Sequence, residues 1–114
     1  MKFYSPMCGG CQEIQPEFEE AKKVYEMMGI KTIVVNIDNY DEMQFANQLG
    51  VLEEGLPNIR MFFEEGNTNG ISIVKGDSSV KSDELVKRVH DHILSIATLE
   101  KNEIGMMKKR KVEL

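Results

Sequence analysis

Cys8 and Cys11 are the only cysteines among the 114 residues of this chain, and only Gly9 and Gly10 separate them. Thiols at this spacing at the start of a helix can exchange electrons as a disulfide or share a metal ion. A thiol that only packs in a core gains nothing from a second thiol three positions away. The pair therefore indicates chemistry, and the competing interpretations are redox exchange and metal ligation.

A structural zinc site would need four ligands, usually with a second pair at similar spacing. The only histidines, His90 and His92, are two apart on a predicted helix, so their side chains point to different faces. We therefore expect no metal and no cofactor. A metal-binding CxxC protein stays open as an alternative.

Length and composition describe one small globular domain. The chain is 41% hydrophobic and 29% charged, and it is long enough for a core without disulfide staples. No apolar run approaches the roughly 18 residues of a membrane span. The start, MKFYSPMCGG, has no apolar signal-peptide region. We therefore expect no membrane partner and a cytoplasmic location.

Charge is distributed unevenly along the chain. Residues 1–107 hold 10 basic and 18 acidic residues, whereas residues 108–111 read KKRK. A nucleic-acid-binding surface would be basic, so the acidic body argues against a nucleic-acid partner. Residues 100–114 lack clear periodicity, and we expect a tail there that extends the last helix or is disordered. The domain itself is placed in residues 1–99.

The cysteines lie between a predicted strand and a predicted helix. Residues 1–4 (MKFY) read as a short strand that stops at Ser5. Pro16 predicts a kink in the helix, and Gly29 is placed to end it. The apolar residues of that helix recur at spacings of four and three: Ile14, Phe18, Ala21, Tyr25 and Met28.

Patterns after residue 30 predict the remaining strands and helices of an α/β domain. They predict a strand over 31–37, a helix from Asn39 to Leu49, a hairpin of strands 57–63 and 71–75, and a helix capped by Ser82. The last helix would turn four apolar residues inward: Leu85, Val89, Ile93 and Ile96. A right-handed crossover makes the first two strands parallel, and the hairpin adds antiparallel strands.

The residues around the cysteines resemble a known family. KFYSPMCGGCQEIQPEFEEAKK is similar to the active-site strand and helix of a protein disulfide isomerase catalytic domain, whose pattern is KFYAPWCGHC followed by a Pro-Glu-Phe helix. VVNIDN, ANQLGV and GLPN resemble the thioredoxin-fold stretch that leads to its cis-proline. The likeness covers residues 1–97, and it combines CxxC at a strand–helix junction with a later Gly-x-Pro.

The resemblance implies a minimal, glutaredoxin-like thioredoxin fold, with a four-stranded mixed sheet and three helices. Met1 already lies within the strand that leads to the cysteines, so the strand over 31–37 becomes an exposed sheet edge. Proteins usually cover such an edge. We expect the C-terminal segment or a second copy, giving a homodimer, to cover it.

The resemblance also implies a thiol–disulfide oxidoreductase that exchanges disulfides with protein disulfide or dithiol substrates. Cys8 would be the nucleophile, because the N-terminus of a helix favours its thiolate. Cys11 would be more buried and would resolve the mixed disulfide. Pro57 would be the cis-proline facing the cysteines, and the backbone of Leu56 would hold an extended substrate.

Three positions depart from the family pattern. Met7 replaces the usual Trp, and Gly10 replaces a His that favours the thiolate, so we expect Cys8 to be less acidic than in the isomerases. Lys2 stands where the family keeps a buried acid that helps to move a proton to or from the second cysteine. A redox-inactive adaptor that keeps the fold for binding is therefore a second alternative. The expected substrate-binding residues are Met7, Gly9, Gly10, Leu56 and Pro57.

The chain ends in KVEL, residues 111–114, which resembles the KDEL-type address that returns proteins to the endoplasmic reticulum. Such an address works only on a protein already inside that compartment. Because no entry signal is visible, we favour coincidence, and the endoplasmic reticulum is the alternative location.

Overall fold

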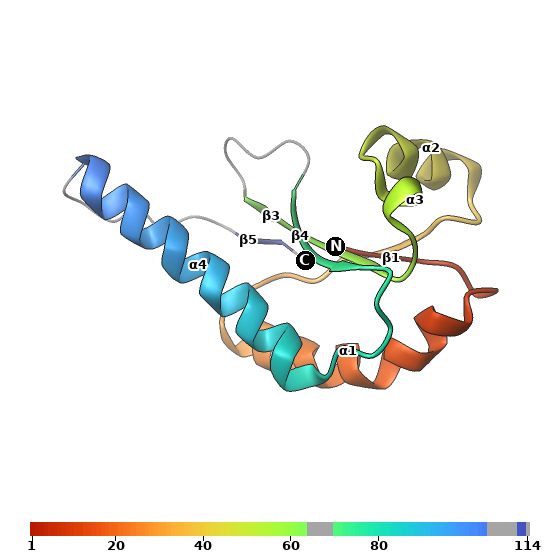
Figure 1. Ribbon diagram of the computed structural model, residues 1–114, viewed down its shortest axis with the longest axis horizontal. Helices are drawn as coiled ribbons and strands as arrows, with labels where there is room; N and C mark the ends of the chain where they lie inside the picture. Colours follow the sequence, from red (N-terminus) through yellow and green to blue (C-terminus); the bar gives the residue numbers. More distant parts are fainter. Residues whose placement is uncertain (64–69, 105–111, 114) are drawn as a thin grey trace.

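The structure is a computed structural model that describes residues 1–63, 70–104 and 112–113. Its elements are β1 (Lys2–Tyr4), α1 (Gly9–Met27), β2 (Val34–Asn36), α2 (Tyr40–Gln48), α3 (Val51–Glu54), β3 (Asn58–Phe63), β4 (Ile71–Lys75), α4 (Ser82–Ile104) and β5 (Val112–Glu113). Helices α1 and α4 cover one face of the sheet, and α2 and α3 lie over the other (Figure 1).

The sheet has the order β2-β1-β3-β4. β1 pairs with β2 in parallel, and β3 pairs with both β1 and β4 in the antiparallel sense. This mixed sheet confirms the predicted thioredoxin fold. The prediction of three helices missed α3, a single turn that begins after Gly50, which has a left-handed φ of 77°.

Two apolar clusters hold the layers together, one on each face of the sheet. The cluster under α1 and α4 includes Phe18, Tyr25 and Leu85, and the cluster under α2 includes Phe3 and Val51. Successive side chains of a strand point to opposite faces. Phe3 therefore packs toward α2, and its neighbour Lys2 is directed toward α1.

Helix α1 has the ends that its sequence predicts. Cys8 is its N-cap, and Gly29 follows the C-cap with a φ of 78°, a conformation that glycine adopts at little cost. Pro16 lies inside the helix. Figure 1 shows the first turns of α1, in red, inclined to the orange remainder, as the predicted kink requires.

Two other helix starts differ from the prediction in detail. The side chain of Asn39 donates to Glu42 Oε2 at 3.1 Å and makes no capping hydrogen bond. Ser82 is the first residue of α4 rather than its cap, and its backbone N–H donates to Glu17 Oε1 at 2.9 Å. The carboxylate of one helix thus supports the start of the other.

The C-terminal strand does not cover the sheet edge at β2. β5 pairs with β3, with Phe62 opposite Glu113, so that half of the edge prediction is wrong. β2 is the outermost strand of the described sheet, and Val34 is 56% exposed. A homodimer across this edge stays a prediction.

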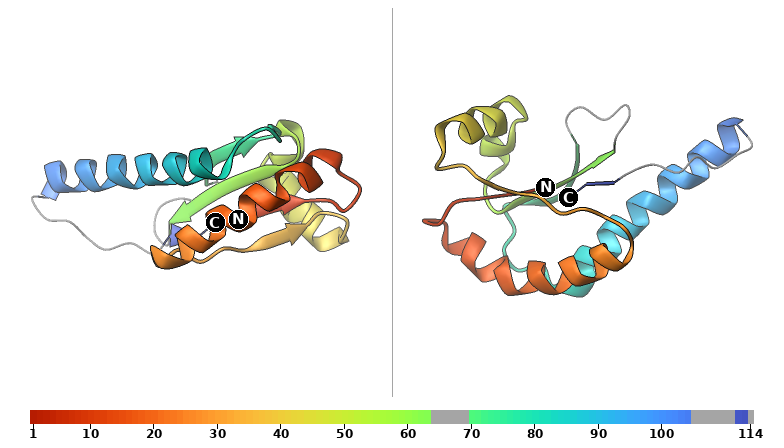
Figure 2. Two further views of the ribbon diagram at one scale, coloured as in Figure 1. Left: turned by 90° about the horizontal axis from the view of Figure 1, so that it is seen from below. Right: turned by 180° about the vertical axis from the view of Figure 1, so that it is seen from behind.

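The tail predicted from residue 100 is described only in part. α4 continues through Ile104, and its C-terminal half projects beyond the sheet (Figure 2). Residues 105–111 and 114, which include most of the basic run, lie outside the described residues. The expectation that KVEL is a coincidence, with a retention address as the alternative, therefore stays a prediction. None of the helices described is long and apolar enough to cross a membrane.

Candidate active site

The two cysteines meet where β1 gives way to α1. A disulfide joins Cys8 to Cys11, and Cys8 Sγ also accepts a hydrogen bond from the backbone N–H of Cys11 at 3.0 Å. Sulfur therefore does what a serine or aspartate oxygen does at other helix starts. A helix N-terminus carries unpaired N–H groups and a partial positive charge, so this position favours an anionic sulfur.

The turn before the cysteines is fixed by Ser5. Its hydroxyl donates to Asp38 Oδ1 at 2.8 Å and accepts from the backbone N–H of Met7 at 3.2 Å. Its carbonyl accepts from the N–H of Cys8 at 3.0 Å. These three hydrogen bonds tie the sulfur that begins α1 to the end of β1 and to the loop after β2.

The two sulfurs differ in how far solvent reaches them. Cys11 is 4% exposed and belongs to the core, whereas Cys8 is partly exposed. Met7, directly before it, is 88% exposed. A molecule that approaches from solvent therefore meets Cys8 first.

The peptide bond between Leu56 and Pro57 is cis, as predicted. Pro57 lies against the cysteine turn, because a Cβ added to Gly10 would be 3.2 Å from Pro57 Cδ and 3.2 Å from Ser78 Cβ. The carbonyl of Pro57 accepts from the N–H of Gly76 at 2.7 Å, which ties this loop to the end of β4. The structure thus brings residues 8–11 and the cis-proline into one surface.

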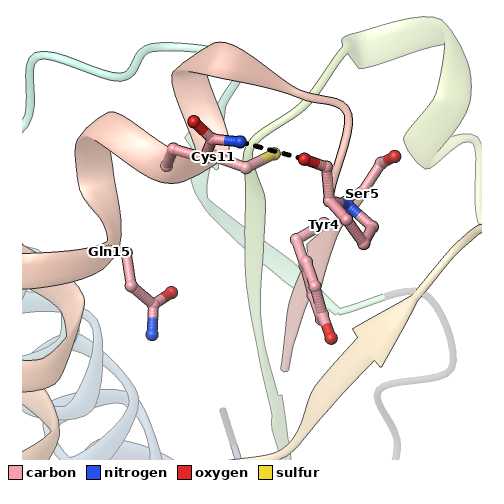
Figure 3. Close-up of a pocket in the computed structure, with 6 residues that line it drawn as sticks. Tyr4, Ser5, Cys11 and Gln15 are labelled. Carbon is pink, nitrogen blue, oxygen red and sulfur yellow. Dashed lines mark hydrogen bonds between the residues drawn. The ribbon is translucent and has the colours of Figure 1, made fainter.

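A cavity of about 270 Å³ lies beside Cys11. Figure 3 shows the sulfur of Cys11 directed from α1 toward Ser5 and Tyr4, with Gln15 one turn further along the same helix. The lining residues are Tyr4, Ser5, Pro6, Cys11, Gln12 and Gln15. The buried Cys11 therefore borders a cavity as well as the core.

The family model for Thioredoxin matches residues 1–91. The chain belongs to the thioredoxin family. Among its relatives, protein disulfide-isomerase of Oryctolagus cuniculus is 34% identical over 68 residues, which are 60% of this chain and 13% of the relative. Protein disulfide-isomerase of Gallus gallus is 33% identical over 67 residues, which are 59% of this chain and 12% of the relative.

A plant relative matches more of the chain. Protein disulfide isomerase-like 2-2 of Oryza sativa subsp. japonica is 29% identical over 91 residues, covering 80% of this chain and 23% of the relative. The chain thus spans less than a quarter of the length of these relatives. No solved structure is matched. The comparisons therefore show a thioredoxin-family domain that is similar to a part of each protein disulfide isomerase.

The structure places the residues expected at a thioredoxin-family site as follows. Gly10 lies against Pro57, whereas a side chain at Gly9 would meet nothing within 4 Å. Leu56 is partly buried and packs its side chain against the apolar cluster of the α2 face. Met7 presents its side chain to solvent. Their roles with substrate stay predictions.

Sequence reasoning missed Ser78. Its Cβ lies against Gly10, and its hydroxyl donates to Glu13 Oε2 of α1 at 2.9 Å. The loop after β4 is thereby fixed to the first turns of the thioredoxin-family helix. Only the turn-rich letters GDSS pointed to a loop here, and a turn signal does not say what the loop contacts.

Lys2 is 2% exposed and lies on the α1 face of β1. Its ammonium donates to Gln15 Oε1 and stands 4.9 Å from the ring centre of Phe18 and 5.6 Å from that of Tyr4. Desolvation by burial lowers the pKa of Lys2 from 10.5, and the negative charge of Glu19 opposes this shift. A buried cation thus adjoins the cavity beside the second cysteine.

A second polar cluster lies behind the cis-proline loop, on the α3 face. Glu54 Oε1 accepts from Arg60 at 2.9 Å and from Asn58 Nδ2 at 2.9 Å, and Lys75 lies 4.0 Å from its other oxygen. Desolvation raises the pKa of Glu54, but the hydrogen bonds and positive charges outweigh it and lower the pKa below 4.5. Glu54 and Asn58 flank the loop that carries Leu56 and Pro57.

In residues 1–63, 70–104 and 112–113, no group of three or more His, Cys, Asp or Glu side chains is placed to hold a metal ion.

Proposed function

We propose that the chain is a thiol–disulfide oxidoreductase whose reacting group is the Cys8–Cys11 pair and whose substrates are exposed disulfides or dithiols of proteins. The single observation that carries the proposal is the placement of Cys8. Its sulfur caps α1 and accepts the N–H of Cys11 at 3.0 Å, and the residue is partly exposed. The two sulfurs lie close enough to form the disulfide that such an exchange requires.

In the reduced chain, the thiolate of Cys8 attacks one sulfur of a substrate disulfide. The substrate S–S bond breaks, a mixed disulfide forms, and the leaving thiolate takes up a proton. Cys11 then loses its proton and attacks Cys8 Sγ, which releases the second substrate thiolate and closes the Cys8–Cys11 disulfide. The substrate gains two electrons and the chain loses two, and the reverse sequence oxidises a dithiol.

The order of attack follows from burial and charge. Cys8 is the sulfur that a large substrate can reach, because Cys11 is only 4% exposed. The helix N-terminus and the hydrogen bond from Cys11 stabilise an anion at Cys8, and the thiolate is the attacking species. Cys11 is then held within bonding reach and can attack only inside the mixed disulfide.

Two features support a protein rather than a small molecule as the substrate. Met7 offers a flexible apolar side chain that is 88% exposed, beside the reactive sulfur. Pro57, directly before β3, lies against Gly10 of the cysteine turn. An extended peptide segment would lie between them, with its sulfur at Cys8.

The test is reduction of insulin by dithiothreitol, followed by the turbidity of the released B chain. The wild-type chain should accelerate this reaction, and Cys8→Ser should not. Cys11→Ser keeps the attacking sulfur, so it should accumulate a mixed disulfide with the substrate, visible by non-reducing electrophoresis. A wild-type rate equal to that of Cys8→Ser would favour the redox-inactive adaptor instead.

A further comparison tests the protein substrate. Met7→Ser should slow insulin reduction several-fold and should leave reduction of hydroxyethyl disulfide, which is too small to span the surface, nearly unchanged. Equal losses with both substrates would show that Met7 acts on the cysteine itself and not on the bound peptide.

A further inference from the structure

The inference that follows rests on the proposed exchange reaction and concerns Lys2, which that reaction does not use. Lysine is almost never fully buried unless its charge has a partner. Lys2 is 2% exposed, and its ammonium donates to the amide oxygen of Gln15 and lies over the rings of Phe18 and Tyr4. A cation kept at this depth calls for an anion that forms during the reaction.

Position points to Cys11 as that anion. Gln15, which accepts the hydrogen bond from Lys2, is one helical turn beyond Cys11 on α1. Gln15 and Cys11 line the same cavity, together with Tyr4, whose ring also lies beneath the ammonium. Figure 3 shows the sulfur of Cys11 directed toward Tyr4 and Ser5. Lys2 therefore contacts two residues, Gln15 and Tyr4, of the cavity that Cys11 also lines.

We propose that Lys2 is a positioning residue for the second step of the exchange: its ammonium, held by Gln15, stabilises the thiolate that Cys11 must form before it attacks Cys8. Within a low-dielectric interior, a positive charge acts over several ångströms with little screening. The Cys11 proton leaves to solvent through the cavity, whose rim includes the exposed Pro6 and Gln12.

Few other charges face this ammonium. From α1, Glu19 opposes the effect of burial on the pKa of Lys2, and it accepts from Gln15 Nε2 at 2.8 Å. Across the sheet, the residues in register with Lys2 are Val34 of β2 and Ile59 of β3, which carry no charge. On the cavity side, Ser5 donates to the carboxylate of Asp38 at 2.8 Å.

A resident carboxylate would repel a Cys11 thiolate, whereas an ammonium attracts it. The expected signature is therefore electrostatic and specific to one sulfur. Replacing Lys2 by methionine, which has a similar length and no charge, should raise the pKa of Cys11 by about one unit. Lys2→Arg keeps the charge and should recover most of the difference.

The first experiment measures Cys11 alone. In a Cys8→Ser background Cys11 is the only thiol, so the pH dependence of its alkylation by iodoacetamide gives its pKa directly. The midpoint should rise by about one unit on Lys2→Met. The matched control is Lys31→Met, the same replacement at an exposed lysine, which should leave the midpoint in place. If the Cys11 midpoint is the same with lysine and with methionine at position 2, the proposal is overturned.

The second experiment follows the complete exchange. Reduced chain mixed with one equivalent of 5,5′-dithiobis(2-nitrobenzoate) should release one thionitrobenzoate as Cys8 attacks and a second as Cys11 resolves. At pH 7 Lys2→Met should slow the second phase about threefold, since a tenfold loss of thiolate is partly offset by the greater reactivity of a more basic sulfur. The relative slowing should fade as the pH rises above the midpoint.

The two phases also separate this inference from the function on which it rests. A wild-type chain that shows no second phase would overturn the exchange reaction itself. A normal second phase that does not respond to Lys2→Met would leave that reaction standing and overturn the role of Lys2. Circular dichroism of Lys2→Met and Lys2→Arg checks that these variants are folded. Gln15→Leu, a change at an exposed position of α1, removes the hydrogen-bond acceptor of the Lys2 ammonium and so tests its position independently.

Discussion

Two buried cations, Lys2 and Arg60, lie on opposite faces of the same sheet. Arg60 is 5% exposed and meets the carboxylate of Glu54 at 2.9 Å behind the cis-proline loop. Lys2 is 2% exposed and meets the neutral side chain of Gln15 beneath the cysteine turn. The charge of Arg60 is therefore paired with a carboxylate, whereas the hydrogen-bond acceptor of Lys2 is neutral.

The difference separates architecture from chemistry. A buried cation with its own carboxylate fixes geometry, here the segment between Glu54 and Asn58 that carries Pro57. A buried cation held by an amide is costly at rest, because the negative charge of Glu19 offsets only part of the desolvation of Lys2. Such a residue is worth keeping only where a negative charge appears during the reaction.

The largest effect on stability should come from breaking the paired cation. Glu54→Ala leaves the guanidinium of Arg60 buried without its carboxylate, and we expect it to cost about 2–3 kcal/mol of the free energy of unfolding. Urea denaturation measures this loss. Glu53→Ala, in the same turn but exposed, is the matched control and should change stability by less than about 0.5 kcal/mol. Equal losses would show that the ion pair is not what holds the loop.

The other cation should respond with the opposite sign. Lys2→Met removes a charge that has lost its water, so we expect the oxidised chain to become more stable by about 1 kcal/mol. The pKa of Lys2 is lower in the folded chain than the 10.5 of the unfolded one, so the folded chain loses this proton first. Wild-type stability should therefore rise toward pH 10.5, and the advantage of Lys2→Met should shrink there.

A loss of stability on Lys2→Met would erase the contrast between the two cations. It would mean that the hydrogen bond to Gln15 and the rings of Phe18 and Tyr4 repay the burial of the ammonium. Urea denaturation of the wild-type and variant chains at neutral pH decides between these outcomes.

The sequence predicted those parts of the site that depend on residues adjacent in the chain. The CxxC pair at the start of a helix, the Gly29 cap and the cis bond before Pro57 each depend on a few adjacent letters. Lys2 was visible too, as a charged residue inside an apolar strand. Its contact with Gln15 was not, because a pattern of apolar spacing does not say which polar side chains meet.

The elements that sequence missed were short or paired over a long distance. α3 has one turn, Val51–Glu54, which is too short for helical periodicity to register. β5 has only Val112 and Glu113, and it pairs with Phe62 and Phe63 of β3, which lie far from it in the sequence. From the sequence we expected the C-terminal segment at the open edge of β2. In the structure, β5 pairs instead with Phe62 and Phe63 of β3.

The smallest effect should appear when acid removes the charge of Glu54. Its pKa is lower in the folded chain than the ordinary value of 4.5, so its ion pair contributes fully above pH 4.5 and is lost as the pH falls through the folded pKa. The stability gap between wild type and Glu54→Gln should therefore narrow between pH 6 and pH 3. Because the Glu54 side chain is 25% exposed, we expect the change to stay below about 1 kcal/mol.

The matched control for this titration is Glu53→Gln, whose gap from wild type should stay constant over the same range. A gap for Glu54→Gln that does not narrow would mean that Arg60 is held by packing and by the amide of Asn58 rather than by charge. The ion pair with Glu54 would then not be what sets Arg60 apart from Lys2. The cation beside the cysteines would no longer be distinguished by its pairing, only by the cavity that it shares with Cys11.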